Sequence, residues 1–243
     1  MLHDGHRAII VDPGDAAPVL AALDDQGLTM AGILVTHHHP DHVGGLAALR
    51  PRLQGPVFGP AREDIPTPFE PLQDGAVVSL LGLDFEVMAV PGHTSGHIAY
   101  FHASAGEVEP PVLFCGDTLF SAGCGRLFEG TPAQMHQSLA RLAALPADTR
   151  VCCAHEYTES NLRFAAAVEP DNADIAEAIV TCRALRAQGL PTLPSTILRE
   201  RAINPFMRCD VAAVVGSAVQ HGAADRSGAA VLGALREWKN NFR

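Results

Sequence analysis

Short apolar runs separated by turn signals fill the first two thirds of the chain and predict alternating strands and helices. Strand-like apolar runs cover residues 7–11, 32–36, 56–58, 76–81, 83–90, 112–115 and 150–153. Helical periodicity covers residues 18–27, 43–50 and 132–145. Gly82 separates two adjacent strand-like runs, which predicts a hairpin, and Thr131 is placed to cap the helix that begins at Pro132.

The pattern changes near residues 155–160, after which strand signals mostly stop. Helical periodicity continues over residues 161–168, 173–188 and 228–239, with a loop at 191–195. We therefore predict an α/β domain over residues 1–157 and a smaller all-α domain over residues 158–243.

Composition and charge narrow the class of protein. Hydrophobic residues make up 47% of the chain and charged residues 18%, which indicates an ordered globular protein. The net charge of -10 disfavours nucleic acid and anionic membranes as partners, because both are bound by clustered lysines and arginines. With scattered cysteines, no visible signal peptide and no apolar run near ~18 residues, we expect a cytoplasmic protein.

Potential metal ligands follow the ends of four apolar runs. They are His37, His39, Asp41, His42, His93, Asp117 and His155. Ligands of α/β sheets gather beyond one end of the strands, so these distant residues are expected to converge. Imidazole and carboxylate groups suit zinc, iron or manganese.

The number of these ligands predicts two metal ions rather than one, because a single tetrahedral ion needs only four. His37 and His39 alternate along an extended segment and can reach one ion. Asp41 and His42 follow around the next turn and can face a second ion. Asp117 suits a bridging position, and the two remaining histidines complete the two sides. Paired ions about 3.5–4 Å apart are an established arrangement for hydrolysis.

Other polar residues near these runs have a plainer interpretation. A single histidine is usually structural or solvated, so we expect His38 to be a spacer that points away and His97 to be a structural neighbour. Asp12 precedes Pro-Gly, where it serves either as a turn residue or as an outer carboxylate behind a ligand. Ordinary surface or packing roles are expected for His3, His6, His102, His136 and His221.

Several segments together resemble the hydroxyacylglutathione hydrolases, also called glyoxalase II, of the metallo-β-lactamase superfamily. They are residues 91–97, 116–120, 123–126, 155–158 and 204–208. The His-x-His-x-Asp-His motif alone indicates only the superfamily, whereas Gly-Cys-Gly-Arg at 123–126 and Asn-Pro-Phe-Met-Arg at 204–208 indicate the narrower family. The resemblance implies an α/β fold, a metallo-β-lactamase αββα sandwich with metals at one edge, followed by the helical glutathione-binding domain.

The resemblance also implies a ligand set. Residues that hold one metal in that family match His37, His39 and His93. Residues that hold the other match Asp41, His42 and His155, and the bridging carboxylate matches Asp117. Zinc is the expected metal, with iron or manganese as alternatives, and catalysis is expected to act through a metal-bound hydroxide held by Asp117, Asp41 and His37.

Glutathione-binding residues are implied in the same way. The basic residue of the 123–126 loop is Arg126, and the tyrosine after the last histidine ligand is Tyr157. Near the C-terminus, Arg236 and Lys239 match a basic pair, and their spacing places them on one helix face. Many relatives have a tyrosine where this chain has Phe128, which removes one hydroxyl from this part of the site.

The implied reaction is hydrolysis of S-(2-hydroxyacyl)glutathione thioesters (EC 3.1.2.6). Its main substrate would be S-D-lactoylglutathione, converted to D-lactate and glutathione in the second step of methylglyoxal detoxification. A bridging hydroxide formed at a water pKa near ~7 would attack the thioester carbonyl. The departing thiolate, with a parent pKa of about 8.5, needs little general-acid help. We expect a monomer.

Three other functions are considered. A persulfide dioxygenase of the same superfamily would use one iron on His37 or a neighbour, His93 and Asp117, and the helical region with its basic pair argues against it. A nuclease is disfavoured by the net charge of -10. A non-catalytic metal- or glutathione-binding module is disfavoured by the complete ligand set.

Overall fold

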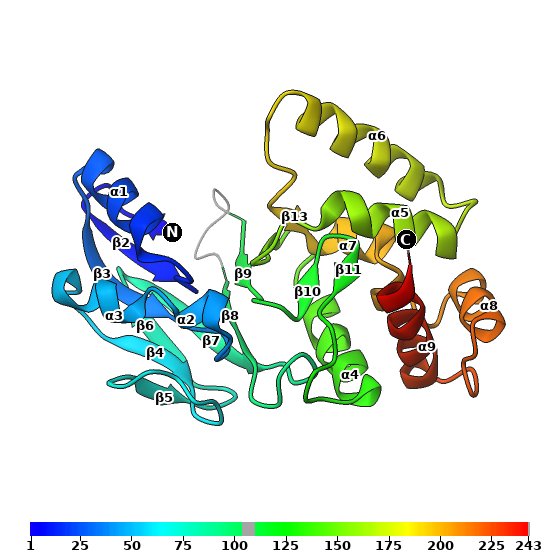
Figure 1. The fold of residues 1–243 in the computed structure, drawn as a ribbon, viewed down its shortest axis with the longest axis horizontal. Helices are drawn as coiled ribbons and strands as arrows, with labels where there is room; N and C mark the ends of the chain where they lie inside the picture. Colours follow the sequence, from blue (N-terminus) through cyan, green and yellow to red (C-terminus); the bar gives the residue numbers. More distant parts are fainter. Residues whose placement is uncertain (104–109, 243) are drawn as a thin grey trace.

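The computed structural model describes residues 1–103 and 110–242, which form two facing sheets with helices on both outer sides. Figure 1 shows the first sheet beside helices α1, α2 and α3, and the second sheet beside α4 and the C-terminal helices. The αββα sandwich predicted from the sequence is therefore confirmed. None of the helices in the described ranges is long and apolar enough to cross a membrane.

The first sheet has the order β1-β2-β3-β4-β5, with β1 antiparallel and the others parallel. Its strands are β1 (Leu2–His3), β2 (Arg7–Val11), β3 (Thr29–Leu34), β4 (Val57–Pro60) and β5 (Glu70–Leu72). In β2, Ala8 and Ile10 pack against α1 (Ala16–Gln26) while Ile9 packs against the second sheet. Both faces of β2 are buried, so its apolar run is continuous rather than alternating.

The second sheet has the order β13-β12-β9-β8-β7-β6. Its strands are β6 (Val77–Leu80), β7 (Leu83–Ala89), β8 (Ile98–His102), β9 (Val112–Phe114), β12 (Arg150–Cys152) and β13 (Ser195–Thr196). The predicted hairpin joins β6 to β7 through Leu81 and Gly82, whose φ values of 55° and 78° are those of a tight hairpin turn. A separate ribbon pairs β10 (Leu119–Phe120) with β11 (Gly123–Cys124).

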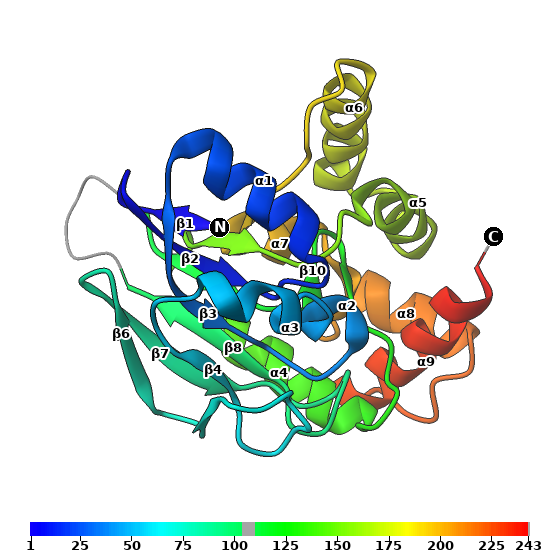
Figure 2. The same cartoon turned by 60° about the vertical axis from the view of Figure 1, so that its left-hand side comes forward.

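Helices of the C-terminal region lie on the outer side of the second sheet, most of them packed against α4 or against one another. They are α5 (Thr158–Val168), α6 (Ala173–Ala187), α7 (Ile197–Ile203), η2 (Pro205–Met207), α8 (Ala212–Gln220) and α9 (Gly228–Asn241). Figures 1 and 2 show α5 and α6 side by side, and α9 packs against α4 and α8. Phe164 and Leu235 of this region share one apolar core with Leu113 of the second sheet.

One expectation about local structure is wrong. The run 43–50 is not one helix but α2 (Pro40–Val43), α3 (Leu46–Leu49) and the short η1 (Arg50–Arg52). The helix is interrupted because Gly44 and Gly45 pack on the loop after β2, where a Cβ on Gly45 would lie 2.6 Å from the Pro13 carbonyl oxygen. The C-terminal region is helical as predicted, apart from the two-residue strand β13, which pairs with β12. The domain boundary itself stays a prediction.

A capping box at the start of α4 (Pro132–Ala143) gives a stability prediction. Thr131 Oγ1 accepts a hydrogen bond from the Gln134 N–H at 3.2 Å, and Gln134 Oε1 accepts one from the Thr131 N–H at 2.9 Å. Thr131→Ala should lower the free energy of unfolding by about 1 kcal/mol, measured by urea denaturation of the metal-free protein. Thr131→Ser keeps the acceptor oxygen and should retain most of that stability; equal losses in both variants would contradict the role of the cap.

Candidate metal centre

The predicted metal ligands all lie at the carboxyl ends of strands, on one edge of the two sheets. The segment 36–42 follows β3, His93 follows β7, Asp117 follows β9 and His155 follows β12. Strands β9 and β12 are parallel, so Asp117 and His155, which follow them, emerge at the same edge of the sheet. The topology therefore brings together side chains that are far apart in the sequence.

Three histidines form the first cluster. His37 Nε2 lies 3.1 Å from His39 Nδ1, and His93 Nε2 lies 3.0 Å from the same His39 atom. All three nitrogens lie within 4.8 Å of one another, close enough to bind one ion. Three imidazole nitrogens that converge at such distances are a metal-ligand arrangement.

A second cluster lies beside the first and shares a carboxylate with it. Asp41 Oδ2 lies 3.2 Å from His155 Nε2 and 3.7 Å from His42 Nε2. Asp117 lies between the clusters: its Oδ2 is 3.5 Å from His93 Nε2, and its Oδ1 is 3.4 Å from His42 Nε2. Each oxygen of Asp117 therefore faces a different cluster.

Outer partners orient the imidazoles. His93 Nδ1 lies 2.8 Å from the carbonyl oxygen of Arg126, a contact in which Nδ1 carries the proton and leaves Nε2 bare. His42 Nδ1 lies 3.1 Å from Asp12 Oδ2, and Asp12 Oδ1 accepts a hydrogen bond from the Thr36 N–H at 2.7 Å. Of the two interpretations left open for Asp12, the structure thus favours the outer carboxylate.

Burial and neighbouring charges set the ionisation of these groups. Burial, reinforced by the surrounding imidazoles, lowers the pKa of His37 far below its ordinary value and also lowers the pKa of His93. Burial opposes protonation of His42 as well, but Asp117 and Asp12 outweigh it and raise the pKa of His42 to about 10. The neutral imidazoles are in the state that a metal requires, whereas His42 must release a proton when an ion binds.

The residues of both clusters fit divalent metal ions. Within the described part of the chain, His42 Nε2 and Asp117 Oδ1 are buried without a well-formed hydrogen bond, although they lie 3.4 Å apart. Buried polar atoms are normally satisfied, so an imidazole nitrogen and a carboxylate oxygen facing one gap indicate a cation between them. The nitrogen and oxygen donors suit zinc, iron or manganese.

Two further histidines of these segments have other partners. His38 turns away from both clusters and contacts the carboxylate of Glu63. His97 stacks on His37 with ring centroids 4.6 Å apart, and its Nε2 accepts a hydrogen bond from the Asp117 N–H at 3.1 Å. Burial lowers the pKa of His97 to about 3, so it stays a neutral acceptor that fixes the backbone of Asp117.

A cavity of about 590 Å³ opens above the clusters and brings together all five predicted substrate-binding residues. Its lining includes Arg126, Phe128, Tyr157, Arg236 and Lys239, with the predicted ligands His39, Asp41, His93, Asp117 and His155. The basic residues place positive charge in an otherwise acidic protein, next to the metal ligands.

Within this cavity the basic pair of α9 is held in place by the rest of the fold. Arg236 is only 7% exposed, and its Nη1 donates to the Cys124 carbonyl oxygen of β11 at 2.8 Å. Its Nε donates to Asn240 Oδ1 at 3.1 Å. Lys239 Nζ donates to the Ser160 carbonyl oxygen at 3.0 Å, and burial, then neighbouring arginines, lowers the pKa of Lys239 to about 8.

Two aromatic residues that line the cavity lie against the predicted ligands. Tyr157 is 49% exposed and stacks on the His155 ring, with centroids 5.1 Å apart. Phe128 is 62% exposed and contacts the rings of His39 and His93 edge-on, with ring centroids 5.7 and 5.3 Å apart. The exposed sides of both rings therefore remain available to a bound molecule.

Sequence reasoning missed several residues that line this cavity: Phe120, Cys124, Ser160, Asn161, Asn240 and Phe242. Helix spacing offers a signal for two of them. Asn240 lies four positions after Arg236 on the same face of α9, and Asn161 lies four positions after Tyr157. Each could be predicted once its partner was assigned to the site.

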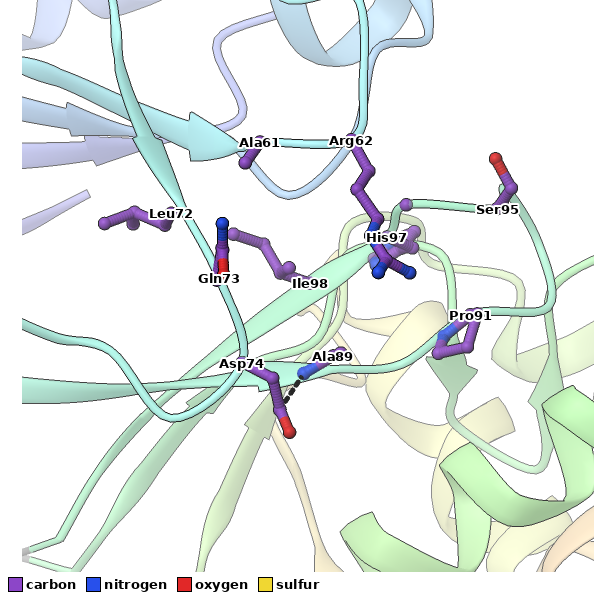
Figure 3. Close-up of a pocket in the computed structure, with 11 residues that line it drawn as sticks. Ala61, Arg62, Leu72, Gln73, Asp74, Ala89, Pro91, Ser95, His97 and Ile98 are labelled. Atoms are coloured by element: carbon purple, nitrogen blue, oxygen red, sulfur yellow. Dashed lines mark hydrogen bonds between the residues drawn. The ribbon is translucent and has the colours of Figure 1, made fainter.

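A second cavity of about 270 Å³ lies on the other side of the segment that follows His93. Figure 3 shows the Arg62 side chain extending toward His97 at one end, while Asp74 accepts a hydrogen bond from the Ala89 N–H at 2.6 Å at the other. Since none of the described residues lining it is a predicted ligand, the metal centre belongs to the larger cavity.

Comparison with known proteins identifies the class first. Residues 1–155 match the model of the metallo-beta-lactamase superfamily. A solved structure described as TTHA1623 in a di-iron-bound form is 30% identical and superposes with a TM-score of 0.56, covering 82% of this chain and 87% of that chain. The fold and the cluster of ligands at the strand ends are therefore those of this superfamily.

The chain belongs to the hydroxyacylglutathione hydrolase family and is a hydrolase of that class (EC 3.1.2.6). Residues 156–242 match the model of the hydroxyacylglutathione hydrolase C-terminus. The hydroxyacylglutathione hydrolase of Albidiferax ferrireducens is 57% identical over 242 residues, covering 100% of this chain and 94% of the relative. That of Pseudomonas fluorescens is 54% identical over 246 residues, with the same coverage. The family predicted from the sequence is confirmed.

The position of Asp117 between the clusters predicts its effect on metal content. Asp117→Asn keeps the size of the side chain but replaces one carboxylate oxygen with an amide, which is a poor metal ligand. We expect metal loading to fall from two ions to at most one per chain, measured by elemental analysis after reconstitution. A variant that retains the metal content of the unaltered protein would show that Asp117 does not connect the clusters.

Proposed function

We propose that this chain hydrolyses S-(2-hydroxyacyl)glutathione thioesters, chiefly S-D-lactoylglutathione, to D-lactate and glutathione. One observation supports this most: Asp117 faces both ligand clusters at the base of a cavity that Arg126 and Lys239 also line. The cavity thus combines a hydrolytic metal centre with positive charge for an anionic substrate. Both features follow from the chain's own residues, and the relatives named as hydroxyacylglutathione hydrolases agree with them.

The ligand clusters would hold two divalent ions. His37, His39 and His93 would bind one, Asp41, His42 and His155 the other, and Asp117 both. Such ions lower the pKa of bound water toward about 7 and stabilise negative charge on a carbonyl oxygen. Zinc is our proposal; the di-iron form of the similar solved structure supports iron as an alternative.

The chain's own residues position the reactants. Asp41, whose carboxylate faces the cavity, and Asp117 would accept hydrogen bonds from the attacking water and orient it toward the thioester carbonyl. His37 lies beneath them, fully buried, and fixes the floor of the site. The departing thiolate has a parent pKa of about 8.5, so the site needs no further proton donor for it.

Glutathione would lie along the helical side of the cavity. Lys239 and Arg126 are placed to pair with its carboxylates, and the Tyr157 hydroxyl to bond its peptide backbone. Arg236 already bonds β11 through Nη1, so it would act partly by holding α9 against the site. Phe128 would supply an apolar wall next to the reacting carbonyl. A cytoplasmic location and a monomeric state stay our predictions.

The experiment is a thioester hydrolysis assay on purified protein. S-D-lactoylglutathione should be hydrolysed by protein reconstituted with zinc, iron or manganese, and activity should be lost after chelation and return when metal is restored. D-lactoyl thioesters of a small thiol, which lack the glutathione moiety, test recognition of the thiol half and should have a much higher KM. Metal-replete protein without turnover of S-D-lactoylglutathione would contradict the proposed function.

Lys239 gives the site a predicted pH dependence. Its pKa is lowered to about 8, so a larger fraction of Lys239 loses its positive charge as the pH rises through 8. A carboxylate of the substrate is bound by the charged form, so kcat/KM, which reports ionisations of the free enzyme, should decline above about pH 8. Lys239→Arg stays charged and should move this decline to higher pH. An unchanged profile in that variant would assign the decline to another group.

A further inference from the structure

Glu63 is a buried carboxylate that the proposed reaction does not use. It lies in the loop between β4 and β5, and its side chain is only 1% exposed. It belongs to neither ligand cluster among the residues that the structure describes. A buried carboxylate is costly unless it is paired or hydrogen-bonded, so its contacts indicate what it does.

The two oxygens of Glu63 bond two different ligand-bearing segments. Oε1 accepts a hydrogen bond from the Thr94 hydroxyl at 2.5 Å and another from the Gly96 N–H at 2.9 Å. Oε2 accepts one from the His38 N–H at 2.8 Å and also contacts His38 Nδ1. Thr94 directly follows the ligand His93, and His38 stands between the two other ligands of the first cluster.

Backbone packing supports this connection independently. A Cβ at Gly96 would lie 2.7 Å from Glu63 Cγ and 2.9 Å from the Arg62 carbonyl oxygen. The two segments therefore approach so closely that a side chain at position 96 would separate them. Figure 3 shows the neighbouring Arg62 on the side of the smaller cavity, where its side chain extends toward His97.

A second carboxylate extends the connection to the loop that carries Arg126. Glu129 Oε1 lies 3.5 Å from His38 Nε2, and Glu129 Oε2 accepts a hydrogen bond from the Ser95 N–H at 2.8 Å. His38 thus lies between two carboxylates. Glu129 is exposed to solvent, so the buried contacts of Glu63 are the stronger ones.

We propose that Glu63 is a positioning residue that sets the distance between the segment of His37 and His39 and the segment of His93. Through this distance it controls the metal affinity of the first cluster. The proposal rests on the proposed function, because it takes these three histidines as the ligands of one ion. Outer partners of metal ligands have this kind of effect, and their loss costs about 10- to 100-fold in metal affinity or activity.

The chemistry of the contacts makes a carboxylate necessary. Both oxygens of Glu63 face donors: a hydroxyl and an N–H on one side, and the His38 N–H on the other. A glutamine has one acceptor oxygen and one amide group that only donates. Whichever way the glutamine is turned, its amide group meets a backbone N–H, that of Gly96 or that of His38. One of the two segments therefore loses its hydrogen bond to residue 63.

The first test is Glu63→Gln, with Glu70→Gln as a control that removes the same charge from an exposed site on β5. Zinc affinity of the metal-free proteins is measured by competition with a chromophoric chelator. We expect affinity for one ion to fall about 10- to 100-fold in Glu63→Gln and to stay unchanged in the control. Equal affinities in Glu63→Gln and the unaltered protein would overturn the proposal.

Further readouts separate positioning from a general loss of structure. The absorption spectrum of the cobalt-substituted protein should change in Glu63→Gln, and kcat should fall with KM little changed. Thr94→Val removes one contact without touching Glu63 and should lower zinc affinity less; combined with Glu63→Gln it should add little, because both act through the same connection. Full additivity, or an unchanged cobalt spectrum, would count against the proposal.

If Glu63→Gln does not fold, Thr94→Val tests the proposal in its place. Unaltered zinc affinity in Thr94→Val would then overturn the proposed role of Glu63. The outcome is distinct from failure of the proposed function. If the unaltered protein binds zinc but leaves S-D-lactoylglutathione intact, the proposed thioesterase activity is refuted. The zinc affinities of the variants would still test the positioning role of Glu63.

Discussion

Buried negative charge at Asp117 is the constraint around which this edge of the fold is arranged. A carboxylate held away from water is unfavourable unless cations or hydrogen-bond donors surround it. Its backbone must also be brought close to β3, and Gly116 permits this, because a Cβ there would lie 2.3 Å from Thr36 Oγ1 and 2.7 Å from His97 Cε1. The surrounding histidines, and the metal ions they imply, complete the compensation.

Two sheets rather than one are needed to surround such a group. The first sheet supplies the segment with four of the ligands, and the second supplies the other three from the ends of β7, β9 and β12. The apolar layer between the sheets, which includes Ile9, Phe85 and Tyr100, fixes their separation. Packing far from the metals therefore sets how closely the two groups of ligands approach each other.

The sequence predicted best what depends on local spacing. Apolar runs located β2, β9 and β12 within a residue, and the predicted ligands could be proposed because they follow the ends of such runs. The break between α2 and α3 could not be predicted, because Gly44 and Gly45 meet a loop that is distant in the sequence. Strand β13 was missed since two residues carry no periodicity of their own.

Glu63 shows the same limit within the site. It lies in a Pro-rich loop where an acidic residue is ordinarily solvated, and nothing nearby in the sequence indicates that His38 and Thr94 will enclose it. Arg236 and Lys239, in contrast, were implied by the family resemblance, and their spacing in the sequence places them on one helix face. Only the contacts showed that Arg236 is largely buried and bonds β11.

The position of α9 has a consequence for how the protein is made. Every metal ligand precedes residue 156, whereas Arg236 and Lys239 lie within the last helix of the described chain. During synthesis the chain emerges from its N-terminus, so the ligand-bearing sheets can form before α9 has left the ribosome. A chain that has not yet been extended to α9 would carry the predicted metal ligands without Arg236 and Lys239, and the apolar face of α4 that α9 covers would still be exposed.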